Sequence, residues 1–142
     1  MLGHILIVED HPAVLNGLSL LLSKEGYQVT TATTVAEAAK RARDNPDLDL
    51  VMTDYHLSAA DTGRQVITVV REVFGPNFQA IISSGDTSKV HCFDGDAYVC
   101  WLCKPMNTAL LLSVLKNFIP QRTPPEPAKL MLGPATPRTI PG

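Results

Sequence analysis

Five polar side chains that could act together each follow a short apolar run. They comprise three carboxylates, one hydroxyl and one ammonium: Glu9, Asp10, Asp54, Ser84 and Lys104. If the runs are parallel strands, their carboxyl ends meet at one edge of a sheet, where ligands of such folds bind. Clustered carboxylates repel one another unless a cation binds, and Mg²⁺ suits such oxygen ligands while leaving room for a phosphate. An ion-pair network, in which Lys104 simply neutralises a carboxylate, is the alternative.

The apolar runs have the composition of strands that are buried on both faces. Ile5 to Val8 and Leu50 to Met52 are continuous rather than alternating with polar residues. This pattern is typical of parallel sheets covered by helices on both sides. We expect strands over residues 4–8, 27–32, 50–53, 79–83 and 99–102. Strands that alternate with helices predict a doubly wound α/β fold with right-handed crossovers.

Two helices are expected in the first third of the chain. The first begins at Pro12, whose missing N–H is harmless in a first turn, and ends at Gly26. The second follows Thr34, which forms a capping-box pattern with Glu37, and continues to about residue 45. Both should cover the sheet.

Two further helices are expected at residues 62–74 and 108–118. An apolar face marks the earlier one: Val66, Ile67, Val70 and Val73. Between them, residues 86–96 show little apolar periodicity, so we expect a short or mobile helix there.

The three cysteines predict no disulfide framework. Cys92, Cys100 and Cys103 are odd in number, whereas a secreted framework needs pairs. Cys100 and Cys103 lie in an expected strand, where positions three apart face opposite ways, which disfavours a zinc site. We expect reduced, buried and inert thiols.

Length and composition predict one domain, with no reason to expect direct nucleic-acid binding or membrane insertion. The chain has 142 residues, 45% of them apolar and 18% charged, with a formal charge of −2. This charge gives no electrostatic reason for direct nucleic-acid binding, and no apolar stretch reaches the roughly 18–20 residues of a spanning helix. We expect a cytoplasmic protein.

The end of the chain differs from the rest. Seven of the last 24 residues are proline, and apolar periodicity is lost. Such a segment buries too little apolar surface to offset the entropy of ordering it. We therefore expect a domain over residues 1–119 and a proline-rich disordered tail over 120–142, with no length left for a DNA-binding unit.

Four ordered segments resemble the marker segments of response-regulator receiver domains of two-component signalling. They are Ile5–Pro12, Leu50–Leu57, Ile81–Gly85 and Lys104–Pro105, and the similarity extends over residues 4 to about 118. The resemblance implies a flavodoxin-like five-stranded parallel sheet of order 2-1-3-4-5. Because the residues after 118 have neither the length nor the pattern of an output unit, we expect a protein partner to read the signal unless the chain is the terminal receiver of a hybrid kinase.

The resemblance also implies a role for each polar residue. Asp54 matches the aspartate that takes a phosphoryl group from a histidine kinase or a histidine phosphotransfer protein. Glu9 and Asp10 match the acidic pair that holds Mg²⁺, or Mn²⁺, together with Asp54 and the backbone carbonyl of His56. The remaining matches are the catalytic lysine, followed by a frequently cis proline, and the hydroxyl and aromatic of the switch: Lys104, Ser84 and Trp101. Such a domain is a signalling phosphoacceptor rather than a conventional enzyme, although it catalyses its own phosphorylation and dephosphorylation.

The sequence departs from the family pattern in one loop and leaves three other functions to consider. Ser58 replaces a common proline in a loop resembling receivers attached to sensor kinases, so the chain could be the terminal receiver of a hybrid histidine kinase. A haloacid dehalogenase-type phosphatase needs a carboxylate where His56 stands. A flavodoxin-like cofactor binder would not place Glu9 and Asp10 against a phosphate. A receiver-like adaptor that works without phosphorylation is the third alternative.

Overall fold

The chain folds around one parallel sheet. A computed structural model describes residues 2–58, 60–85 and 95–119. The five strands follow the order β2-β1-β3-β4-β5, and every neighbouring pair is parallel. Their bounds are β1 His4–Val8, β2 Gln28–Ala32, β3 Leu50–Asp54, β4 Gln79–Ser84 and β5 Val99–Cys103. The predicted fold and strand order are confirmed, and each predicted strand lies within two residues of the observed one.

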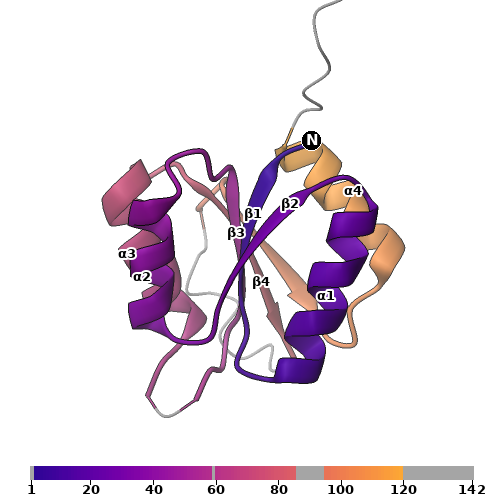
Figure 1. Cartoon of the computed structure of the whole chain (residues 1–142), viewed down its shortest axis with the longest axis horizontal. Coiled ribbons are helices and arrows are strands. Elements are labelled where there is room, and N and C mark those ends of the chain that lie inside the picture. The colour runs from indigo at the N-terminus through magenta and orange to yellow at the C-terminus, as the bar shows by residue number, and fades with distance from the viewer. Residues whose placement is uncertain (1, 59, 86–94, 120–142) are drawn as a thin grey trace, which may run out of the picture.

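Helices cover both faces of this sheet. They are α1 Pro12–Lys24, α2 Val35–Asp44, α3 Gly63–Phe74 and α4 Thr108–Phe118. Figure 1 shows α2 and α3 together on one face and α1 and α4 on the other. No helix in the described part of the chain is long and apolar enough to cross a membrane.

Alternate residues of the buried strands supply two separate cores. Leu6 and Val8 belong to the cluster beneath α2 and α3, whereas Ile5 and Ile7 belong to the cluster beneath α1 and α4. Both faces of β1 are therefore apolar, because a strand with helices on either side has no face left for water. This explains the continuous apolar runs of the sequence.

Side-chain caps begin the second and third helices. Thr34 accepts a hydrogen bond from the Glu37 amide, as predicted, but the Glu37 carboxylate accepts from Thr33 N and Oγ1 instead of completing the box at Thr34. The complete capping box is one that the pattern analysis missed, formed by Thr62 and Gln65 at the start of α3.

Two burial predictions are wrong. Val73 is 41% exposed, whereas Phe74 in the same turn of α3 packs against the core cluster beneath α2 and α3. Cys103 is also exposed, whereas Cys100 is partly buried and burial raises the pKa of its thiol.

The weak helix expected at 86–96 falls mostly outside the described residues, as do Cys92 and the tail at 120–142.

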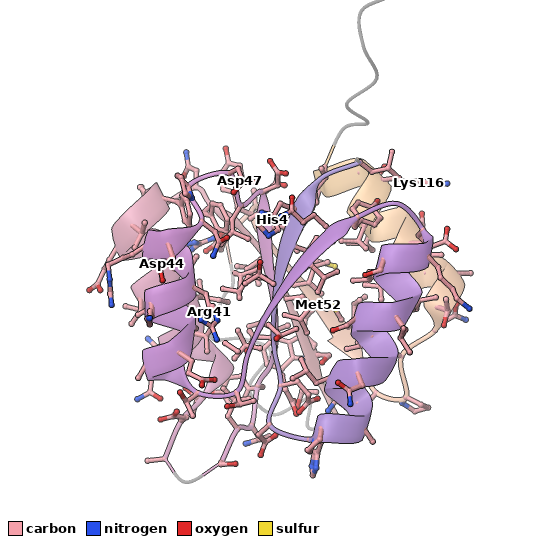
Figure 2. All side chains as sticks on the ribbon, viewed as in Figure 1. His4, Arg41, Asp44, Asp47, Met52 and Lys116 are labelled. Carbon is pink, nitrogen blue, oxygen red and sulfur yellow. The ribbon has the colours of Figure 1, made fainter. Side chains whose placement is uncertain are left out.

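At the edge of the sheet opposite the carboxyl ends, the His4 ring is hydrogen-bonded to two polar side chains. His4 is buried, with Nδ1 3.0 Å from Asp47 Oδ2 and Nε2 2.6 Å from Thr30 Oγ1. Figure 2 shows His4 and Asp47 side by side there. Because both ring nitrogens have partners, this buried histidine is a structural residue that ties β1 to β2 and to the loop before β3.

The backbone of β3 and the start of α3 approach each other closely at Gly63. The Gly63 N–H donates to the Tyr55 carbonyl at 2.7 Å, and a Cβ atom on Gly63 would lie 2.6 Å from the Asp54 carbonyl oxygen. No side chain fits there without moving the helix. Gly63 thus allows α3 to start directly against the end of β3.

We expect Gly63→Ala to destabilise the fold by roughly 1–3 kcal/mol, since the new methyl group clashes with backbone rather than with a flexible side chain. Gly17→Ala is the matched control, because nothing lies within 4 Å of a Cβ at that exposed helical position. It should stabilise α1 by about 0.5–1 kcal/mol. Urea unfolding of both variants measures the contrast, and equal effects would contradict the account.

The end of α3 is tied to the segment before β5 by an ion pair. Arg71 donates from Nη1 to Asp96 Oδ2 at 2.7 Å and from Nη2 to Oδ1 at 3.3 Å, while its Nε donates to the Phe78 carbonyl. The hydrogen bonds from Arg71, and one from the Tyr98 amide, lower the pKa of Asp96 below 3.8. The charged form is therefore the one that the fold stabilises.

Asp96→Asn should destabilise the protein at pH 7 by about 1 kcal/mol, the upper range for a partly exposed pair. Because folding lowers this pKa, the contribution is complete above the unfolded value of 3.8 and is lost as the pH falls through the folded value. The difference in urea midpoint between the wild type and the variant should therefore be smaller at pH 3 than at pH 7. Asp44→Asn, at an exposed i,i+4 pair with Lys40, is the control with little expected change.

Candidate functional site

Strand ends bring three carboxylates and one ammonium together. Glu9, Asp10 and Asp54 each place a carboxylate oxygen within 4.8 Å of the others. Lys104 Nζ donates to Asp54 Oδ2 at 2.9 Å and lies 3.8 Å from Glu9 Oε1. Four of the five predicted site residues therefore meet at the carboxyl edge of the sheet, where Figure 1 shows β1 passing into α1.

Glu9 is the most deeply placed of the three carboxylates. It is 2% exposed, and its Oε2 accepts hydrogen bonds from the Asp10 and His11 amides. Burial, followed by the charge of Asp54, raises its pKa above the usual 4.5. Placing a negative charge here is thus unfavourable, and a bound cation would relieve it.

The second carboxylate, Asp10, is held by the loop after β3. It is partly buried, and Oδ2 accepts a hydrogen bond from the Ser58 hydroxyl at 2.7 Å. This bond is the main reason why the pKa of Asp10 is lowered from 3.8. Asp10 therefore stays ionised beside Glu9, which is the state that a cation needs.

Lys104 reaches the site from the loop after β5. The peptide bond to Pro105 is cis, as the resemblance implied, and the Lys104 amide donates to the Ser84 carbonyl at 2.9 Å. The ion pair considered as an alternative does exist, between Lys104 and Asp54. One ammonium against three carboxylates nevertheless leaves excess negative charge, so the pair does not remove the reason for a cation.

Ser84 and Trp101 lie on the neighbouring strands β4 and β5. Ser84 is 1% exposed at the end of β4, one residue beyond Ser83, which is paired with Asp54 in the sheet. The Trp101 ring packs against the Tyr55 ring on the α3 side of the sheet, and the two ring centroids lie 5.5 Å apart. Within the described ranges, its indole N–H is buried without a hydrogen-bond partner.

His56 follows Asp54 at two residues' distance and points outward. Its side chain is exposed, and its ring lies nearly perpendicular to the Tyr55 ring with the two ring centroids 5.0 Å apart. Its backbone bridges to Thr62 across the loop. The imidazole is thus not among the three side chains of the acidic cluster.

A cavity of about 190 Å³ adjoins the site between α1 and the loop after β5. The polar wall of the cavity is formed by Glu9, Ser83 and Lys104, and its apolar wall by Val14, Leu18, Pro105 and Met106.

Two residues of the site were not predicted from the sequence, Ser83 and Ser58. For Ser83 the only available signal was its place beside Ser84, and for Ser58 it was the departure from a common proline.

Comparison with known proteins agrees with this geometry. The sequence-family model of the response regulator receiver domain matches residues 5–116 of this chain. The transcriptional regulatory protein GlrR of Escherichia coli strain K12 is 29% identical over 124 residues, which are 86% of this chain. The two-component response regulator ORR27 of Oryza sativa subsp. japonica is 45% identical over 60 residues, which are 41% of this chain. The matched part of the chain spans only 10% of the length of ORR27 and 27% of the length of GlrR.

Solved structures of receiver domains share the fold of this chain. A CheY-like receiver domain protein from Methanospirillum hungatei JF-1 is 28% identical, with a TM-score of 0.70 over 82% of this chain and 93% of that one. The receiver domain of the hybrid histidine kinase CckA is 27% identical, with a TM-score of 0.68 over 82% and 98%.

If the carboxylate cluster binds a cation, millimolar MgCl₂ should raise the melting temperature of the wild type, since the ion offsets repulsion between Glu9, Asp10 and Asp54. Asp10→Asn should lose most of this rise because it removes one ligand charge. Asp44→Asn makes the same charge change at an exposed site and should keep it. Equal rises in both variants, measured by differential scanning calorimetry, would refute a specific site.

Proposed function

Because this chain belongs to the response regulator receiver domain family, whose model matches residues 5–116, we propose that Asp54 is its phosphoacceptor. The donor is a phosphohistidine of a histidine kinase or a histidine phosphotransfer protein. The observation that carries the proposal is the Lys104–Asp54 contact of 2.9 Å beside Glu9 and Asp10. It puts a nucleophilic carboxylate, a fixed positive charge and an oxygen-rich cation site in one place.

In the proposed transfer, a carboxylate oxygen of Asp54 attacks phosphorus and the P–N bond of the donor breaks, so that the electron pair leaves with the imidazole. Negative charge accumulates on the phosphoryl oxygens near a carboxylate that is only 8% exposed. Lys104 offsets this charge from a position that is already set in the fold, so little reorganisation is needed. The protein contributes position and electric field more than covalent chemistry.

The acidic cluster fits a divalent cation of the kind that receiver domains bind. We assign Glu9, Asp10 and Asp54 as its ligands, with the His56 backbone carbonyl as a fourth protein oxygen. Bound Mg²⁺, or Mn²⁺ in its place, would supply positive charge next to the phosphoryl oxygens. The strongest support is geometric, since the three carboxylates place oxygens within 4.8 Å of one another and their mutual repulsion favours a positive partner.

We further propose that phosphorylation is read through Ser84 and Trp101. Ser84 is joined to Lys104 by a backbone hydrogen bond, and Trp101 packs on Tyr55, the residue after Asp54. A phosphoryl group that draws in the Ser84 hydroxyl would change the space available to Trp101. Full switching takes about 5.5 kcal/mol of differential stabilisation, so a partial shift is equally compatible with signalling.

Parentage and location complete the proposal. The likeness to the hybrid-kinase receiver supports a terminal receiver of a hybrid kinase, with a stand-alone response regulator as the second possibility. We assign residues 1–119 to the receiver domain and 120–142 to a tail, in a cytoplasmic protein that signals to another protein. The phosphatase alternative is disfavoured because the exposed His56 imidazole, not a carboxylate, stands two residues after Asp54.

Incubation with Mg²⁺ and acetyl phosphate should add one phosphate to the wild type, detected by intact mass spectrometry. Asp54→Asn should add none, because an amide is not a nucleophile for phosphorus, whereas Asp44→Asn should react as the wild type does. EDTA should abolish the reaction in every sample. A phosphate that persists on Asp54→Asn would disprove the assignment and favour an adaptor or another acceptor.

A further inference from the structure

Ser58 makes a contact that the proposed chemistry does not itself require. Its hydroxyl donates to Asp10 Oδ2 at 2.7 Å, across 48 residues of sequence, although the side chain is exposed. We propose that Ser58 is a positioning residue that orients Asp10 as a one-oxygen ligand, and so selects Mg²⁺ over Ca²⁺. This inference rests on the cation site of the proposed function.

The loop that carries Ser58 is anchored at both ends. Its base is closed by the bridge between His56 and Thr62. Inside it, the Leu57 amide donates to the Asp61 carbonyl and the Asp61 amide donates to the Ser58 carbonyl, both at 3.2 Å. Ser58 therefore sits on a turn with its own hydrogen bonds, rather than on a free segment.

Asp61 also fastens this turn to the body of the protein. Its Oδ2 accepts a hydrogen bond at 2.9 Å from the amide of Val35, the first residue of α2. A carboxylate is favoured at a helix N-terminus, where amides are otherwise unpaired. The position of the Ser58 hydroxyl is thus set by α2 as well as by the local turn.

Each carboxylate of the cluster has its own protein donors. Two backbone amides hold Glu9, Lys104 holds Asp54, and the Ser58 hydroxyl holds Asp10. Of the three, Asp10 is the most exposed. A ligand oriented in advance loses less conformational entropy when the cation binds, which strengthens binding.

Holding one oxygen also restricts how Asp10 can bind. Mg²⁺ takes octahedral, one-oxygen ligands, whereas Ca²⁺ readily takes both oxygens of a carboxylate. Because the Ser58 hydroxyl already occupies one lone pair of Oδ2, two-oxygen binding by Asp10 would compete with this hydrogen bond, whereas one-oxygen binding would not. Loss of the hydroxyl should therefore weaken Mg²⁺ more than Ca²⁺, which a merely structural role would not do.

Competition against Mn²⁺, with free Mn²⁺ measured by electron paramagnetic resonance, gives the dissociation constants of Mg²⁺ and Ca²⁺ without any phosphorylation. Ser58→Ala should raise the Mg²⁺ constant by about ten-fold, the lower end for residues that orient metal ligands. The Ca²⁺ constant should change less, so that selectivity falls. Ser58→Thr keeps the hydroxyl and should retain selectivity, and Ser113→Ala, at an exposed position of α4, should match the wild type.

The outcomes separate the two hypotheses. A wild type that binds neither Mn²⁺ nor Mg²⁺ would overturn the cation site and the Ser58 inference together. Wild-type binding with unchanged selectivity in Ser58→Ala would overturn the Ser58 inference alone. An equal loss for both ions, or a loss of folded structure by circular dichroism, would make Ser58 merely structural and would equally count against it.

Discussion

At the carboxyl edge of the sheet, one ammonium faces three carboxylates, and this imbalance of charge governs the rest of the site. Lys104 can neutralise Asp54, at 2.9 Å, but it lies 3.8 Å from Glu9 and does not balance the cluster. Burial makes the remaining repulsion more costly than it would be in water. The protein compensates in part with the amide donors to Glu9 and the hydroxyl donor to Asp10.

The fold was predictable because its apolar pattern and its topology depend on the same physics. Continuous runs such as Ile5 to Val8 require helices on both faces, and the observed cores divide those residues between α2/α3 and α1/α4. The gathering of Glu9, Asp10, Asp54 and Lys104 followed from strand ends alone, since parallel strands carry their final residues to one edge.

The parts that were missed or wrong depend on contacts between segments distant in sequence. Ser58 reaches Asp10 only because the loop folds back over the edge of the sheet, and no local pattern encodes that path. Val73 continues the apolar periodicity of α3 but is 41% exposed, because an apolar pattern does not specify how much of a helix its neighbours cover. Cys103 likewise ends β5 at an exposed edge, where strand composition does not report accessibility.

Trp101 has a practical consequence. It is the only tryptophan in the chain, and its indole packs against Tyr55 with the N–H buried. Indole emission is sensitive to the polarity around the ring, so the tryptophan fluorescence of the unlabelled protein arises from a single place on β5. A spectroscopist can therefore watch that strand in solution without introducing a dye.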